Sequence, residues 1–341
     1  MTASTSSSRT ERFLKSLRQN LTEGNYYEGH QELRAIASRY VKQKKPSQAI
    51  RLLYLGALEL CQYHQWGSVA DLISYMINLY QEEHVEVTAE SKERVFDVFE
   101  KLSQATEYYG RVYEAAIQWT VAEMGGAGDP QMHHFVACVL RTKARYPEAE
   151  SHFLVGTPES PAALGSMLFD WASRTGATDY GVFVARGVLR YLALGWYEGA
   201  CFCWRAFMNR MATALSDIVT EKAHAGVPSK IGPVYFVTGG NHQQVNFVQL
   251  LLLAVERSDG SPHGEAAKAF EELRRRYEES FGVNAGVVHD LMDGVAEKYF
   301  GVVVHRQQSL FDIVNSLFAP PPSRPAISSG KDAVAENEAM D

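Results

Sequence analysis

The sequence predicts an all-α superhelix, a solenoid built from helical hairpins. Apolar residues recur at helical spacing over most of the chain, beginning with Phe13, Leu14, Leu17 and Leu21. A short pattern also returns along the chain: an aromatic residue or proline, then Glu or Gln, then a small residue. Single hairpins of this kind cannot bury their apolar faces alone, so they stack into elongated arrays.

The repeated pattern marks where we expect helices to begin. It is fullest at Tyr26-Tyr27-Glu28-Gly29 and returns at Tyr113-Glu114-Ala115, Tyr146-Pro147-Glu148-Ala149 and Trp196-Tyr197-Glu198-Gly199-Ala200, with a weaker copy at Pro46-Ser47-Gln48-Ala49. Glu114 and Glu148 are 34 residues apart, which is typical of helical hairpins, whereas Glu148 and Glu198 are 50 apart. The array is therefore expected to be irregular, with the small residues where helices approach closely. Because solenoids mostly bind proteins, a scaffold is favoured over an enzyme.

The individual helices follow in order from near Glu11. Residues 1–8 are rich in Ser and Thr and are expected to be a disordered N-terminus without a secretory signal. Asn25 with Glu28 suggests a capping box for the second helix, and Pro46 suits the first turn of the third. Asp129 with Pro130 opens a later helix after a glycine-rich break. Further helices are predicted over 68–81, 88–104, 112–123, 131–143, 146–154, 160–174, 179–193 and 197–214.

The pattern changes between residues 226 and 246. The segment 234–238 has strong strand preference, and Gly239-Gly240-Asn241 is typical of a tight turn. We therefore expect one short β-hairpin near 233–246, with its return strand through 243–245. Helices are predicted again over 247–256, 264–281, 287–300 and 309–318, and residues 319–341 are expected to be a disordered C-terminal tail.

Charge is distributed unevenly along the chain. The net charge is −7, yet residues 9–51 contain ten Lys and Arg against four acids, a net +6 that leaves −13 on the remainder. A basic end on an acidic body suits the steering of an acidic partner. Arginine and tyrosine are also preferred interface anchors, which favours protein binding near Tyr26 and Tyr27. A solubilising surface is the alternative, and RNA binding is disfavoured by the acidic remainder.

Motifs for catalysis or cofactor binding are missing from the sequence. It contains no P-loop, no H-E-x-x-H and no G-x-S-x-G, and the adjacent His133 and His134 would face apart on a helix. The four cysteines form no C-x-x-C pair and lie in apolar runs, which indicates reduced core thiols. No apolar stretch reaches the roughly 18 residues of a membrane span. We therefore expect a cytosolic protein that is not an enzyme and needs no cofactor or metal.

Several segments closely resemble the scaffold subunit of the guided-entry pathway for tail-anchored membrane proteins, the Golgi to ER traffic protein four family. The resemblance is carried by Gly24 to Gln31, Ile36 to Val41, Gly56 to Leu58, Gly67 to Leu72, Tyr146 to Phe153 and Phe247 to Leu253. It extends from about Arg9 to Phe318 and implies a solenoid of tetratricopeptide-like hairpins with a late β-hairpin.

The resemblance implies an adaptor with two halves. Residues 9–155 would dock on the dimeric ATPase that carries tail-anchored clients. Residues 156–318 would bind a ubiquitin-like partner subunit, which recruits a co-chaperone holding the client. The scaffold would pass the client to the ATP-bound ATPase while hydrolysis is restrained. The alternative is a helical-repeat interaction module in another cytosolic complex.

The resemblance also implies roles for single residues. The predicted ATPase-binding residues are Arg12, Lys15, Arg18, Tyr26, Tyr27, His30 and Lys42. Ser16 occupies a basic position of the family, so that charge is expected at Lys15 or Arg18. Asp71 matches the acid that restrains hydrolysis, although a helix-surface acid or a local cap is the alternative. The residues predicted to bind the ubiquitin-like partner are Val234, Phe236, Phe247, Leu250 and Leu251.

Overall fold

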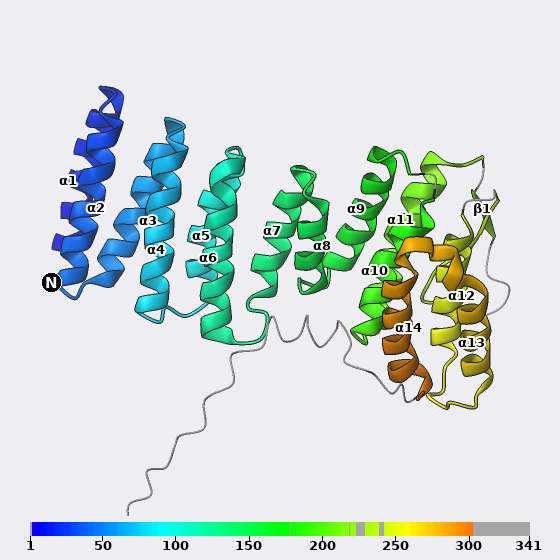
Figure 1. Ribbon diagram of the computed structural model, residues 1–341. Helices are drawn as coiled ribbons and strands as arrows, with labels where there is room; N and C mark the ends of the chain where they lie inside the picture. Colours follow the sequence, from blue (N-terminus) through cyan, green and yellow to red (C-terminus); the bar gives the residue numbers. More distant parts are fainter. Residues whose placement is uncertain (1, 178, 218, 223–228, 239–241, 303–341) are drawn as a thin grey trace, which may run out of the picture.

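The helices stack largely in sequence order into an elongated array, and the last described helix returns to pack against an earlier one (Figure 1). The computed structural model describes residues 2–177, 179–217, 219–222, 229–238 and 242–302. The helices of the first half are α1 (Thr2–Thr22), α2 (Tyr26–Lys42), α3 (Pro46–Gln62), α4 (Trp66–Glu82), α5 (Ala89–Leu102), α6 (Thr106–Met124), α7 (Pro130–Thr142) and α8 (Tyr146–Leu154). The second half contains α9 (Ser160–Arg174), α10 (Gly181–Ala193), α11 (Tyr197–Ala214), β1 (Val219–Lys222), β2 (Val234–Val237), α12 (Gln243–Glu256), α13 (Glu265–Tyr277), the 3-10 helix η1 (Glu278–Asn284) and α14 (Ala285–Phe300). The predicted all-α superhelix is confirmed.

The first four hairpins repeat regularly. Their second helices begin at Tyr26, Trp66, Thr106 and Tyr146, so successive starts are 40 residues apart. The prediction of an irregular array is therefore wrong for these four hairpins, because Glu114, from which the spacing of 34 residues was counted, lies inside α6 rather than at its start. The regular period places equivalent positions of successive hairpins beside one another.

Small residues allow neighbouring helices to approach closely, as the repeated pattern predicts. A Cβ atom added to Gly29 in α2 would lie 2.9 Å from the Leu17 side chain of α1. The approach between α9 and α11 is closer still, since a Cβ on Gly165 would lie 2.1 Å from the Cys203 carbonyl oxygen. Only glycine fits at such a position unless the backbone moves.

The two-stranded sheet differs from the predicted hairpin. β2 forms where a strand was predicted, but it pairs antiparallel with the earlier β1, and Val219 lies opposite Val237. Residues 243–245, predicted as the return strand, are instead the first turn of α12. Val245 and Val248 are buried three residues apart, so the helical apolar pattern of α12 already begins there.

Two predictions about helix starts are also wrong. α1 begins at Thr2, so its helix includes most of the segment 1–8 that was expected to be disordered. No glycine or proline interrupts that segment, and the helix propensities of Ser and Thr are only modestly less favourable than that of Ala. Asn25 makes no side-chain cap bond to α2. By contrast, Asp129 accepts a hydrogen bond from the Met132 backbone N–H at 2.8 Å, which confirms the predicted start of α7.

The cysteines are unpaired, as the sequence predicts. All four cysteines are free thiols, with Cys61, Cys201 and Cys203 buried and Cys138 half-buried. The predicted helix over 309–318 and the predicted tail over 319–341 lie outside the described residues.

Candidate functional site

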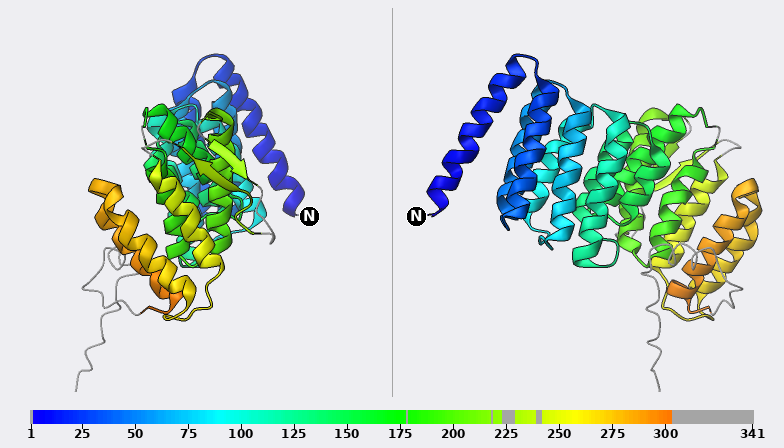
Figure 2. Two further views of the ribbon diagram at one scale, coloured as in Figure 1. Left: turned by 90° about the vertical axis from the view of Figure 1, so that its right-hand side faces the viewer. Right: turned by 60° about the vertical axis from the view of Figure 1, so that its left-hand side comes forward.

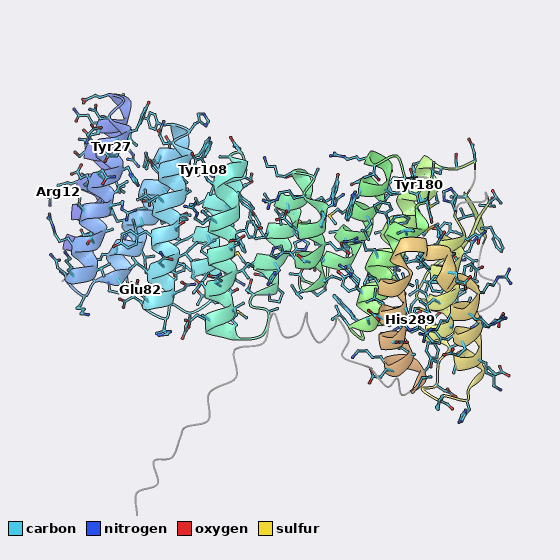
Figure 3. The ribbon with its side chains drawn as sticks, in the orientation of Figure 1. Arg12, Tyr27, Glu82, Tyr108, Tyr180 and His289 are labelled. Atoms are coloured by element: carbon cyan, nitrogen blue, oxygen red, sulfur yellow. The ribbon has the colours of Figure 1, made fainter. Side chains whose placement is uncertain are left out.

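Four exposed cations lie on the first two helices, and we call them the N-terminal basic surface: Arg12, Lys15 and Arg18 of α1, and Lys42 of α2. The three α1 residues are spaced by three, so they follow one side of that helix; Arg12 is labelled in Figure 3. The Arg18 guanidinium donates to Glu59 Oε1 of α3 at 2.6 Å, which partly compensates its charge. Lys15 and Lys42 form no ion pair within the part of the chain that the structure describes.

The two adjacent tyrosines face different ways, as predicted. Tyr26 is half-buried, and its ring centroid lies 5.5 Å from that of Tyr63 at the end of α3. Tyr27 is 70% exposed and is labelled near the α1–α2 turn in Figure 3. An exposed tyrosine offers a large contact area at low entropic cost. Tyr27 is therefore the more available anchor for a partner.

Asp71 of α4 is held by two residues of α2. The Asp71 carboxylate can only accept, so His30 Nε2, 2.8 Å from Oδ2, carries the hydrogen and donates it. The Arg34 Nη1 donates to both Asp71 oxygens, and its guanidinium lies 5.5 Å from the ring centroid of Tyr75. His30 and Asp71, predicted for separate roles, thus belong to one network that joins two hairpins.

The network fixes the charge of Asp71. Burial disfavours its ionised form, but the hydrogen bonds from Arg34 and His30 outweigh burial and lower the pKa of this carboxyl group. Its side chain is still 39% exposed. An ionised carboxylate is therefore present at neutral pH at the junction of α2 and α4, while His30 is only 9% exposed and acts mainly as its support.

The late apolar residues fall into two groups. Phe236 of β2 and Leu250 of α12 are 49% and 41% exposed, and Val234 is half-buried. Phe247 and Leu251 are buried, so their predicted direct contact with a partner is corrected. Their four-residue spacing places them on the inner side of α12, where Phe247 packs 5.5 Å from the Phe281 ring centroid.

A side-chain amide holds the sheet against α12. Gln249 Oε1 accepts from the Tyr235 backbone N–H at 2.8 Å, and Gln249 Nε2 donates to the Tyr235 carbonyl at 3.0 Å. These two bonds imitate the pairing of a further strand. They hold β2 firmly against α12, the helix that presents Leu250.

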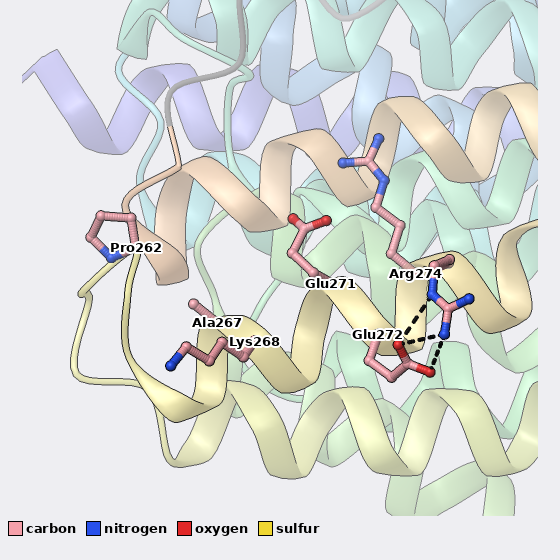
Figure 4. Close-up of a pocket in the computed structure, with 7 residues that line it drawn as sticks. Pro262, Ala267, Lys268, Glu271, Glu272 and Arg274 are labelled. Carbon is pink, nitrogen blue, oxygen red and sulfur yellow. Dashed lines mark hydrogen bonds and ion pairs between the residues drawn. The ribbon is translucent and has the colours of Figure 1, made fainter.

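A charged pocket on α13 offers no catalytic arrangement (Figure 4). Its Glu272 carboxylate is already paired with Arg275 at 2.6 Å. Across the described ranges, no group of three His, Cys, Asp or Glu side chains is suited to hold a metal ion. The helices described here are also too short or too polar to cross a membrane.

Comparison with known proteins identifies the family. The family model for Golgi to ER traffic protein 4 matches residues 43–318. The chain belongs to the Golgi to ER traffic protein 4 family. Golgi to ER traffic protein 4 of Schizosaccharomyces pombe is 27% identical over 300 residues, which cover 87% of this chain and 92% of the relative. The Dictyostelium discoideum homologue is 25% identical over 312 residues, covering 91% and 89% of the two chains.

A solved structure agrees in fold. The crystal structure of C. therm. Get4 superposes with a TM-score of 0.75 and 24% sequence identity, covering 95% of this chain and 100% of that one. Membership of the Golgi to ER traffic protein 4 family supports a role in the targeting pathway of that family. It also favours an adaptor with protein partners over an enzyme.

Two residues that shape the N-terminal region, Arg34 and Glu59, were not among the predicted site residues. Arg34 binds Asp71, and Glu59 binds Arg18. Arg34 lies four residues after His30, so the two share a side of α2, and this spacing was a usable signal. No such sequence signal pointed to Glu59, because its partner Arg18 lies in another hairpin, 41 residues away.

Proposed function

We propose that this chain is a cytosolic adaptor that bridges the ATPase for tail-anchored membrane proteins and a ubiquitin-like partner subunit. Residues 9–155 bind the dimeric ATPase, and residues 156–318 bind the ubiquitin-like subunit. A co-chaperone on that subunit supplies the client. The adaptor thereby brings donor and ATP-bound acceptor together while hydrolysis is restrained.

The observation that carries this proposal is the separation of two unlike surfaces along the array. The N-terminal basic surface lies on α1 and α2 at one end, and the sheet with α12 lies toward the other end (Figure 2). Separate surfaces allow two partners to bind without competing for the same residues. Family membership indicates the pathway to which both partners belong.

The N-terminal end suits an acidic partner. Lys15 and Lys42 are exposed, and Tyr27 supplies an exposed aromatic anchor on the same helix as Lys42. Charges of this kind mainly raise the association rate and make binding sensitive to salt. The Asp71 carboxylate supplies the negative group of this end and is proposed to restrain hydrolysis by the bound ATPase.

The late region suits an apolar partner segment. Phe236 and Leu250 present apolar area from two elements that Gln249 joins. Burial of such residues stabilises long-lived complexes, because apolar area removed from water contributes roughly 25 cal/mol per Å². Phe247 and Leu251 support this surface from below and do not contact the partner.

The proposal is tested by mixing the full chain with the ATPase dimer and the ubiquitin-like subunit and measuring complex mass. We expect one complex that contains all three proteins. Phe236→Ser with Leu250→Ser should remove only the ubiquitin-like subunit. The matched control Val287→Ser, which alters an exposed apolar residue of α14, should remove neither. Mutually exclusive binding of the two partners would contradict the bridging role.

A further inference from the structure

A pocket of about 350 Å³ lies between α7, α8 and α9 in the middle of the array. It is lined by Cys138, Arg141, Thr142, Tyr146, Asp170 and Arg174. These helices lie between the N-terminal basic surface and the two-stranded sheet (Figure 1), so the pocket is separate from the N-terminal basic surface and from the sheet that carries Phe236. Its volume is at the low end for ligand sites and suits one side chain better than a nucleotide.

The pocket carries surplus positive charge. Arg141 Nη2 donates to Asp170 Oδ2 at 2.8 Å, and Arg210 donates to the other oxygen of the same carboxylate. Arg174 follows Asp170 by one turn of α9 and is exposed. No carboxylate of the described chain pairs with Arg174. Arg141 and Arg174, which line the pocket, and Arg210, which binds Asp170, thus accompany a single acid, a local surplus of two positive charges.

Neighbouring acids do not remove this surplus. Glu148 is bound to Arg145. Glu150 is fully buried and accepts from both Arg186 and Arg190. Burial raises the pKa of the Cys138 thiol, so this group stays neutral and adds no negative charge.

The aromatic wall of the pocket is preorganised. The Tyr146 ring stacks on Trp171 with centroids 5.4 Å apart. The Arg186 guanidinium carbon lies 5.0 Å from the centroid of the same Trp171 ring. Tyrosine and arginine together are the residues that dominate protein-binding energetics. A preorganised wall limits the entropy that binding must remove.

We propose that this pocket binds an acidic side chain, Asp or Glu, of an extended protein segment, with Arg174 and Arg141 contacting its carboxylate. The planar carboxylate matches the fork of a guanidinium group. Asp170 already demonstrates this geometry within the pocket, since its two oxygens are shared by two arginines. This inference is independent of the proposed ATPase and ubiquitin-like partners.

The test uses the full chain and N-acetyl-glutamate N-methylamide, a capped residue with one free carboxylate. Binding is followed by NMR of the arginine Nε–H groups. We expect saturable shifts at Arg174 and Arg141, and at least tenfold weaker binding of the matched neutral glutamine probe. Arg174→Gln should weaken binding of the glutamate probe at least fivefold. Arg51→Gln, at an exposed arginine of α3, should leave that binding unchanged. Asp170→Asn should tighten binding because it removes the competing charge.

Three results would overturn the assignment. Equal shifts with the glutamine probe would show that charge is not recognised. Equal shifts at Arg51 would show general screening of exposed arginines. Tighter saturable binding of inorganic phosphate at Arg174 would make the pocket a phosphate site rather than a carboxylate site. A thermal scan of each variant establishes that the fold is retained.

Discussion

The hairpins of α1–α4 and the helices α9–α12 both contain polar bridges, including Arg210 with Asp170 in the later region, but they differ in how closely their backbones approach. Between the early hairpins, polar bridges reinforce the leucine core: Arg18 with Glu59, and His30 with Asp71, each pair 41 residues apart. Between the later helices, backbones approach closely at glycine. Gly165 lies against Cys203 in this way, and a Cβ on Gly181 would lie 2.6 Å from the Val245 nitrogen.

This difference indicates which surfaces remain available to partners. Polar bridges at the exposed side of α1–α4 leave charged groups at the surface, where salt and partners reach them. Close backbone contact in α9–α12 leaves little tolerance for change, so that region presents a rigid platform. We expect substitutions at the polar bridges of α1–α4 to affect mainly binding, and substitutions at the close backbone contacts of α9–α12 to affect mainly stability.

The largest effect should come from the buried side of α12. Leu251→Ala removes a fully buried side chain and should lower the free energy of unfolding by about 2–5 kcal/mol. Leu250→Ala, at the adjacent exposed position, should change stability by less than about 0.5 kcal/mol but weaken binding of the ubiquitin-like partner. Urea unfolding and a binding titration of both variants distinguish these roles. Equal stability losses would contradict the division of α12 into two sides.

A smaller loss should follow from Gly165→Ala. The added methyl group meets the Cys203 carbonyl, and overpacking of this kind costs about 3 kcal/mol at the upper end of its usual range. Gly110→Ala in α6 meets no atom within 4 Å and should be neutral or slightly stabilising. Thermal unfolding of the two variants measures the contrast. An unchanged midpoint for Gly165→Ala would show that α9 and α11 can separate freely.

Acid should destabilise the junction between α7 and α8. His133 Nε2 donates to the Ala127 carbonyl at 2.7 Å, so its Nδ1 accepts from His152 Nδ1, 2.8 Å away. Burial lowers the pKa of His152 to about 4 from 6.5. Between these values only the unfolded chain takes up the proton, so stability falls as pH drops, by about 2 kcal/mol at pH 5.

Urea midpoints at pH 7.5 and pH 5 measure this pH dependence. His152→Asn cannot titrate and should show a flatter profile over the same range, even if its stability at pH 7.5 is lower. A wild-type midpoint that does not fall between these two pH values would contradict a neutral, hydrogen-bonded histidine pair.

Loss of the Asp71 charge should affect stability less than the changes at Leu251, Gly165 and the histidine pair. Because its side chain is 39% exposed, solvent screens the contacts, and Asp71→Asn should cost less than about 1 kcal/mol. ATPase binding should be largely retained, while the restraint on hydrolysis weakens. A steady-state ATPase assay with and without the variant measures this effect, with Glu90→Gln as the exposed-acid control. Unchanged hydrolysis would remove Asp71 from the regulatory role.

Local pattern predicted most of the helices because their apolar faces are periodic. The segments 146–154, 160–174 and 197–214 match α8, α9 and α11 at both ends. The sheet partner was missed because Val219 pairs with Val237 across an intervening segment, and no turn signal joins these strands. Pairing of that kind depends on tertiary packing, which cannot be inferred from the periodicity of apolar residues along the sequence.

The candidate site was predicted less completely than the fold. Exposure of Tyr27 followed from adjacency on a helix, since neighbours face different ways. The network of Asp71, His30 and Arg34 did not follow, because it requires the register between two hairpins. Phe247 and Leu251 were assigned to a partner because apolar residues of α12 were treated as one group. Only the packing of α12 against its neighbours separates the buried members from the exposed ones.

The most direct test of the two-ended account is ATPase binding by the double variant Arg12→Glu with Lys42→Glu, measured at low salt. We expect loss of ATPase binding by at least about tenfold with full retention of the ubiquitin-like subunit, because the altered charges lie only on α1 and α2. Unchanged ATPase affinity at low salt would contradict it.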